Sequence, residues 1–234
     1  MKNEILQHLN QVGICVLEEY YPKEYCDIAI KDIEDGLKKY SNKVLNEKKE
    51  GTSGDFRLFK MENHYSTAKN FSTDKDLLEI ASLYKNYPMI SHFVLGGKLE
   101  SIENEIRNSG AGWHKDSGHE TQIKTIVYLS DVDETNGPFM FLPIPKQTQI
   151  PTRDGNPNYT RYSDLEIDNF IKNNNISPFV VTGKKGTVIF ADTSYIHRGA
   201  NIKEGKRYTY TNYYFENHPQ RISLSEQTWG KYYI

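Results

Sequence analysis

The feature that most constrains the fold is a change of hydrophobic periodicity near Pro88. Before this proline, apolar residues recur every three or four positions, which is the pattern of a helix that buries one face. Between residues 22 and 40, for example, the apolar positions are Cys26, Ile30, Ile33, Leu37 and Tyr40. After Pro88, short alternating segments are separated by turn residues, as in β-strands. The change predicts a mostly β protein with flanking α-helices, whose many short strands form a sandwich or jelly roll.

The expected elements follow this division of the chain. Residues 1–88 are expected to contain helices at 22–40 and 74–85 and strands at 13–17 and 56–61. The later part is expected to contain strands at 90–95, 99–107, 122–129, 139–144, 179–181, 186–191 and 206–215. A weak helical pattern at 162–173 indicates an inserted loop with a helix. We expect a single domain over 1–234, in which residues 1–88 pack on a jelly-roll core at about 89–216.

Composition excludes several classes of protein. The 29 Lys and Arg residues nearly balance the 31 Asp and Glu residues, so no strong field favours nucleic acid or an anionic membrane. The first residues have charges inside their apolar stretch, and no segment is apolar enough to span a membrane. Two cysteines are too few for a disulfide framework, which favours the reducing cytoplasm. The sequence does not fix an oligomeric state.

Three residues form a candidate metal site. His114 and Asp116 are two positions apart, so on extended backbone both side chains lie on one face. An isolated His-x-Asp is expected by chance about once in such a chain, and a structural histidine is the simplest alternative. His197 follows the buried-type segment 186–192 and begins the next expected strand. In a jelly roll such separated strands lie side by side, so the three side chains can converge; Asp192 and Glu120 are alternative carboxylates.

Two imidazoles and one carboxylate form the ligand set of non-haem Fe(II) oxygenases and leave adjacent coordination positions open. A 2-oxo acid can occupy two of these positions and O2 the third. The far carboxylate of the acid then needs a partner, and an arginine is suited to this because its guanidinium is bidentate and always charged. Arg207, on the expected strand at 206–215, can provide this contact.

The order of motifs resembles a known family. GAGWHKD, NGPFMFLP, GTVIFADTSYIHRGAN and KRYTYTNYY occur in the order seen in the phytanoyl-CoA dioxygenase-like branch of the Fe(II)/2-oxoglutarate-dependent oxygenases. The resemblance implies a double-stranded β-helix (jelly roll, cupin-like) core with Fe(II) bound by His114, Asp116 and His197. It also implies 2-oxoglutarate anchored by Arg207, with the Thr209 hydroxyl near the same carboxylate.

The chain departs from the family at two motifs. Ile144-Pro145-Lys146 stands where relatives often have Gly-Ser-His, and residues 104–110 lack the usual Lys-x-Pro-Gly. Co-substrate contacts from these regions therefore stay unassigned. Family members that halogenate have Gly or Ala at the position of Asp116, so the resemblance implies hydroxylation or a related oxidation.

The expected function is a dioxygenase that uses Fe(II), 2-oxoglutarate and O2 to hydroxylate a small-molecule substrate, releasing succinate and CO2. One alternative is a cupin-like metalloenzyme that does not use 2-oxoglutarate; Arg207 argues against it, because such an enzyme needs no arginine facing the metal. The other is a non-catalytic jelly roll that binds a ligand. The loops at 41–70 and 146–175 are expected to select the substrate.

Overall fold

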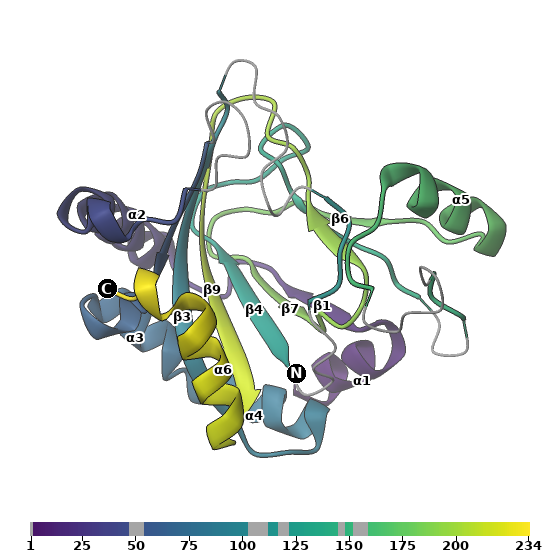
Figure 1. Ribbon diagram of the computed structural model, residues 1–234, viewed down its shortest axis with the longest axis horizontal. Coiled ribbons are helices and arrows are strands. Elements are labelled where there is room, and N and C mark those ends of the chain that lie inside the picture. The colour runs from purple at the N-terminus through teal and green to yellow at the C-terminus, as the bar shows by residue number, and fades with distance from the viewer. Residues whose placement is uncertain (1, 47–53, 103–111, 117–121, 145–147, 152–158) are drawn as a thin grey trace.

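The computed structural model describes residues 2–46, 54–102, 112–116, 122–144, 148–151 and 159–234. Two antiparallel sheets face each other and helices cover the outside of the larger one (Figure 1). The larger sheet has the strand order β1-β7-β4-β9-β3-β2, and the smaller has the order β6-β5-β8. Among the described residues, no helix is both long and apolar enough to cross a membrane.

The strands of the larger sheet come from both parts of the chain. They are β1 (Ile14–Leu17), β2 (Asp55–Phe59), β3 (Met89–Glu100), β4 (Ile123–Tyr128), β7 (Val188–Ala191) and β9 (Lys206–Glu216). The smaller sheet consists of β5 (Phe139–Phe141), β6 (Phe179–Val181) and β8 (His197–Gly199). Because side chains alternate between the faces of a strand, each strand of the larger sheet contributes to two cores. Ile126 and Ile189 face the smaller sheet, whereas Val127 and Phe190 face the helices.

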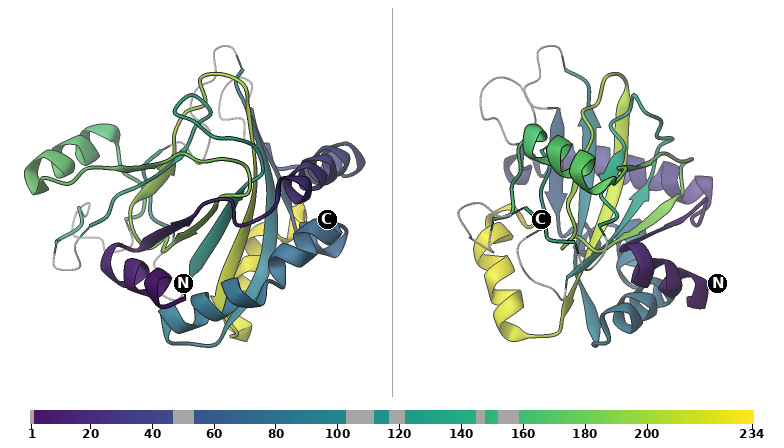
Figure 2. Two further views of the ribbon diagram at one scale, coloured as in Figure 1. Left: turned by 180° about the vertical axis from the view of Figure 1, so that it is seen from behind. Right: turned by 90° about the vertical axis from the view of Figure 1, so that its right-hand side faces the viewer.

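Four helices pack against the outer face of the larger sheet (Figure 2). They are α1 (Lys2–Val12), α2 (Lys23–Lys39), α3 (Ser66–Ser72) and α4 (Lys75–Lys85). The apolar stripe of α2 buries Cys26 and Ile33 fully, which follows from its spacing of three and four residues. Asp74 caps α4 by accepting hydrogen bonds from the backbone N–H groups of Asp76 and Leu77. These contacts fix the sheet whose inner face carries the candidate site.

Two further helices lie away from that layer. A capping box formed by Ser163 and Glu166 begins α5 (Asp164–Asn174), which lies beyond the smaller sheet (Figure 1). Pro219 begins α6 (Pro219–Trp229), and short 3-10 helices occupy Ser41–Lys43, Met61–Asn63 and Gly230–Tyr232. The Trp229 ring stacks on Phe59 with ring centroids 5.2 Å apart, so α6 packs at the end of the space between the sheets.

The predicted mostly β architecture with flanking helices is confirmed, but several elements differ. Residues 90–95 and 99–107 are not two strands: β3 runs unbroken to Glu100, and 103–107 lie outside the described residues. Gly96 and Gly97 continue the strand, paired with β2 on one side and β9 on the other. An added Cβ at Gly96 would press on Met61, and one at Gly97 would press on Thr209. The helices α1, α3 and α6 were not predicted. The N-terminal part also contributes β1 and β2 to the larger sheet, besides packing on it.

Candidate active site

The backbone places two histidines directly opposite each other. His114 donates its N–H to the carbonyl of His197 at 2.9 Å, and His197 donates to the carbonyl of His114 at 2.7 Å. The backbone N–H of Asp116 donates to the carbonyl of Thr193 at 2.8 Å, which fixes the third residue. The reciprocal pair forms a hydrogen-bonded bridge, so both imidazoles project to the same side.

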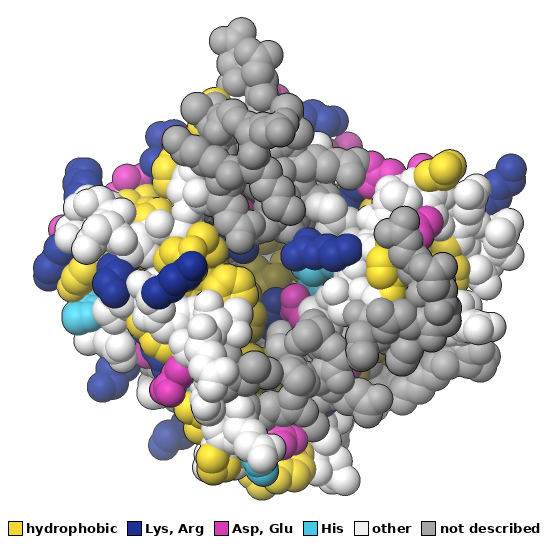
Figure 3. All heavy atoms as spheres, viewed as in Figure 1, with side chains coloured by type: hydrophobic (Ala, Val, Ile, Leu, Met, Phe, Trp, Pro, Cys, Tyr) yellow, Lys and Arg dark blue, Asp and Glu magenta, His cyan; other side chains and the backbone are white. Residues whose placement is uncertain are grey.

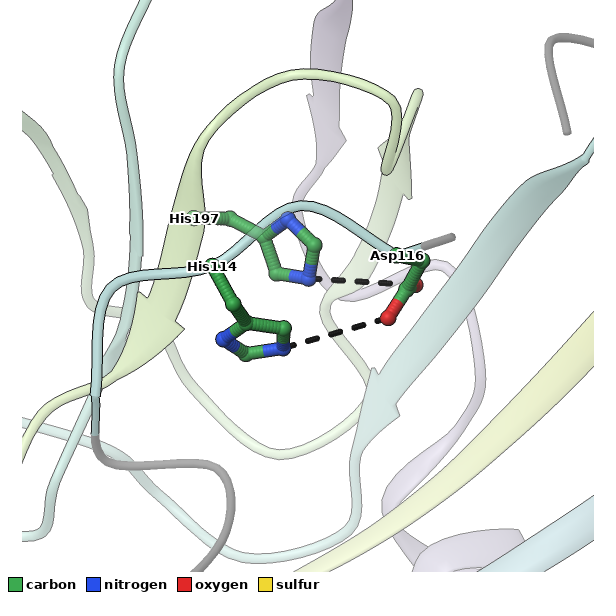
Figure 4. Close-up of side chains that lie close together, drawn as sticks. All are labelled: His114, Asp116 and His197. Atoms are coloured by element: carbon green, nitrogen blue, oxygen red, sulfur yellow. Dashed lines mark ion pairs between the residues drawn. The ribbon is translucent and has the colours of Figure 1, made fainter. Parts of the chain in front are cut away.

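The three side chains converge (Figure 4). The centroids of the His114 and His197 rings are 4.3 Å apart. Each Nε2 atom lies 3.8 Å from a different oxygen of the Asp116 carboxylate. One candidate ligand atom from each residue lies within 4.8 Å of the other two. The arrangement therefore presents two nitrogens and one oxygen around a common point.

The other nitrogen of each ring sets the tautomer. Nδ1 of His114 lies 2.8 Å from the carbonyl oxygen of Gly112, and Nδ1 of His197 lies 2.9 Å from that of Tyr195. A carbonyl only accepts, so each Nδ1 carries the proton and donates it. Each Nε2 then has an unshared electron pair directed toward Asp116. This second contact is the one that orients histidines bound to metals in proteins.

Electrostatics favours neutral imidazoles and an ionised carboxylate. Burial, the adjacent His197 and Arg161 lower the pKa of His114 to about 3, although Asp116 opposes the shift. Burial likewise lowers the pKa of His197. Burial alone would raise the pKa of Asp116, but Lys124 and the two histidines more than offset this and lower it. At neutral pH the three residues are therefore in the protonation states that bind a divalent metal.

Two side chains at the start of β4 hold Asp116: Lys124 within the strand and Gln122 just before it. The Lys124 ammonium forms an ion pair with Oδ2 of Asp116, and the Gln122 amide donates to the same oxygen at 3.2 Å. Burial would lower the pKa of Lys124, but the Asp116 carboxylate outweighs burial and raises it. Sequence reasoning did not single out either residue. Both line the cavity, but no local signal marks them, because a glutamine and a lysine at the start of a strand normally reach solvent.

The triad lies in a cavity of about 590 Å³ between the two sheets. Figure 3 shows its mouth as a hollow near the centre of the face seen in Figure 1. Its polar residues include His114, Asp116, His197, Gln122, Lys124, Arg161, Arg207 and Thr209; its aromatic residues are Phe59, Phe93, Tyr128, Phe139, Tyr213, Phe215 and Trp229. Arg57 of β2 also lines the cavity. It pairs with Asp55, whose carboxylate accepts from Nε at 3.1 Å.

Arg207 and Thr209 line the same cavity from β9. They are two positions apart on one strand, so both face inward. Burial lowers the pKa of Arg207, whose electrostatic neighbours are Tyr128, Asp55 and Arg57. Within the described part of the chain, the Arg207 guanidinium has neither a hydrogen bond nor an ion pair to a carboxylate. The structure therefore brings all five predicted site residues to one cavity, in which Arg207 can accept an anion.

Of the two alternative carboxylates named from the sequence, Asp192 makes contacts away from the triad. Asp192 forms an ion pair with Lys85 at 2.7 Å and accepts from the Tyr84 hydroxyl at 2.9 Å. It also accepts from the backbone N–H of Ser194 at 3.1 Å, which is a turn contact. Glu120 lies outside the described residues, as do parts of the loops expected to select the substrate.

Comparison with known proteins finds similarity among solved structures but not among family models or curated sequences. No family model matches the chain, and no curated protein does so significantly. Among solved structures, the non-haem α-ketoglutarate-dependent epimerase SnoN from nogalamycin biosynthesis is 15% identical with a TM-score of 0.72, over 92% of this chain and 83% of SnoN.

Two other neighbours have the same architecture. HygX from Streptomyces hygroscopicus, solved with nickel and 2-oxoglutarate, is 14% identical with a TM-score of 0.65, over 93% of this chain and 88% of HygX. EctD from S. alaskensis, solved with 2-oxoglutarate and 5-hydroxyectoine, is 16% identical with a TM-score of 0.67, over 90% of this chain and 74% of EctD. At such identities the likeness establishes the fold. The predicted double-stranded β-helix is confirmed.

Proposed function

We propose that this protein is a non-haem Fe(II)- and 2-oxoglutarate-dependent dioxygenase that hydroxylates a small-molecule substrate and releases succinate and CO2. The observation that carries the proposal is the convergence of His114, Asp116 and His197 in one cavity with the buried Arg207. The neighbours support the cofactors, because their structures include Fe3+ with α-ketoglutarate, nickel with 2-oxoglutarate, and bound Fe. The order of the motifs supports our assignment of the chain to the phytanoyl-CoA dioxygenase-like branch.

The donor set fits a divalent iron ion. Both Nε2 atoms present electron pairs because both Nδ1 protons are donated to backbone carbonyls. One carboxylate with two imidazoles is the facial set that leaves coordination positions for co-substrate and O2. When bound, the iron supplies the oxidising chemistry that no protein side chain can provide. One oxygen atom of O2 enters succinate as CO2 is lost, and the other enters a C–H bond of the substrate.

The chain's own residues position the reactants. Arg207 binds the distal carboxylate of 2-oxoglutarate, because its guanidinium offers paired N–H donors in a buried setting. The Thr209 hydroxyl donates to the same carboxylate. The walls of the cavity keep bulk water from the reacting atoms. Asp116 fills the position where halogenating relatives have Gly or Ala, which favours hydroxylation. The reaction is expected in the cytoplasm.

The test is product formation by the reconstituted protein. Anaerobically purified protein is mixed with Fe(II), 2-oxoglutarate and a cellular metabolite extract and then exposed to O2. We expect succinate together with a metabolite that has gained one oxygen atom. His114→Ala should abolish both, whereas His64→Ala, which removes an exposed histidine that contacts Tyr40, should not. A jelly roll that binds metal without 2-oxoglutarate chemistry would form no succinate.

A further inference from the structure

A buried lysine stands at the opposite end of the cavity from Arg207. The Lys124 residue is 7% exposed and lines the cavity. Its ammonium has three N–H donors. One interacts with Asp116 and a second with the side chain of Tyr213, whose ring centroid is 4.2 Å from the nitrogen. A donor therefore remains for a group inside the cavity.

The charges of the loaded site leave this ammonium without a full partner. Asp116 neutralises Lys124 in the structure. Under the proposed function the same carboxylate also binds a dication. In the loaded site, the dication and Arg207 together carry three positive charges, and Asp116 and the 2-oxoglutarate dianion together carry three negative charges. These charges cancel, so the positive charge of Lys124 is left over. An unpaired charge in a buried site is costly, so a further anion is favoured there.

The other cations of the cavity wall do not change this balance. Arg57 is paired with Asp55. Lys98 is paired with Glu34 at 3.1 Å and with Glu100 at 3.2 Å. Arg161 lies at the mouth, exposed, and its charge adds to the positive potential felt by both histidines. The described lining residues therefore favour an anionic ligand near Lys124.

The register separates this position from the distal carboxylate of the co-substrate. Lys124 pairs with Tyr213 across the two strands, whereas Arg207 lies six residues earlier on β9. Six residues of strand span roughly 20 Å, so the two cations cannot serve the same carboxylate. Around Lys124 the cavity wall is aromatic: Phe93 stacks on Tyr213 with centroids 4.3 Å apart, and Phe59 stacks on Trp229 of α6.

We propose that the substrate is a carboxylic acid with a flat apolar body, that its carboxylate binds Lys124, and that the aromatic wall formed by Phe59, Phe93, Tyr213, Phe215 and Trp229 holds the body. This assignment rests on the proposed function. A monoanion matches the single charge that remains, which favours a carboxylate over a phosphate dianion. Because Lys124 also contacts Asp116, the carbon atoms beside the carboxylate lie nearest the metal and are the ones oxidised.

The experiment compares acids with amides of the same shape. Phenylacetate, 3-phenylpropanoate and 4-phenylbutanoate and their primary amides are titrated calorimetrically into protein loaded with Mn(II) and 2-oxoglutarate. We expect at least one acid to bind tenfold or more tightly than its amide. Lys124→Met, which keeps the length of the side chain, should abolish the preference. Lys98→Met removes a charge that is already paired and should retain it.

The outcomes separate the two proposals. If 2-oxoglutarate does not bind the metal-loaded wild type, the proposed function fails and the assignment of Lys124 falls with it. If 2-oxoglutarate binds but no acid is preferred, or if the preference persists in Lys124→Met, only the assignment of Lys124 is overturned. If Lys124 had a purely structural role, Lys124→Met would weaken the binding of acid and amide equally.

A second readout reports the orientation of the ligand. Mn(II) is paramagnetic and broadens the proton resonances of a bound ligand according to distance. We expect the methylene protons beside the carboxylate of the preferred acid to broaden more than its ring protons. The reverse order would overturn the placement of the carboxylate at Lys124.

Discussion

Removal of the Arg207 guanidinium should weaken 2-oxoglutarate binding more than any other single loss of charge in the cavity wall. The group is buried, and within the described residues no carboxylate neutralises it, because the nearby Asp55 is already paired with Arg57. Two unit charges 4 Å apart interact by about 4 kcal/mol at an effective dielectric constant of about 20. Truncation of a buried charged partner costs about 2 to 5 kcal/mol. Arg207→Ala should therefore lower the affinity roughly thirtyfold or more.

The assay is calorimetric titration of 2-oxoglutarate into metal-loaded protein with O2 excluded. Arg207→Lys should recover only part of the loss, because an ammonium cannot reproduce the two parallel hydrogen bonds of a guanidinium. Lys98→Met removes a positive charge from the same cavity wall, but one paired with Glu34 and Glu100, and should change the affinity little. An Arg207→Ala affinity within about threefold of wild type would refute the assignment of Arg207 as the anchor.

Three further predictions concern the metal, pH and the backbone. Alanine at His114, Asp116 or His197 should remove the single bound Fe(II) per chain, measured by metal analysis, with an unchanged circular dichroism spectrum; full metal content in all three variants would contradict the ligand assignment. Burial lowers the pKa of His92 from 6.5 to about 4, so on acidification the unfolded chain takes up a proton before the folded chain does and stability falls below pH 6.5. Between pH 6.5 and 5 the free energy of unfolding should fall by about 2 kcal/mol from this source, and urea unfolding of His92→Phe should show a fall that is smaller by this amount. Equal falls in wild type and variant would exclude His92 as the source. Gly186→Ala should lower the unfolding free energy by about 2 kcal/mol or more, because φ is +93° and an added Cβ would collide with a backbone carbonyl; an unchanged urea midpoint would contradict this.

The sequence predicted the elements whose signal is local. The apolar stripe of α2 and the alternating tyrosines of β9 are repeated several times, so the period is clear without tertiary information. The break predicted between residues 95 and 99 was wrong, because two adjacent glycines resemble a turn locally, whereas both are paired with β2 and β9 in the sheet. The helix α6 has a weak amphipathic pattern, and it is stabilised by long-range contacts such as the stack of Trp229 on Phe59.

Candidate site residues were predictable where chemistry and spacing coincide. His114 and Asp116 share a face by spacing alone, and His197 was found from its position after a buried strand. Lys124 was missed because a single lysine in a strand normally reaches solvent, and only the pairing of β4 with β9 shows that it points into the cavity. Which side chains surround a ligand depends on how two sheets face each other, which the periodicity of one strand does not encode.

Protein groups orient all three residues of the triad. Each imidazole is oriented by a backbone carbonyl, and the backbone of Asp116 is fixed by Thr193. Its carboxylate is held by Lys124 and Gln122. The cores on both faces of the larger sheet contain none of the three ligands. In proteins where a metal organises the fold, by contrast, the ligands have no fixed arrangement without it. Here backbone and side-chain hydrogen bonds orient the three residues, so we expect a substitution in the triad to test metal binding separately from folding.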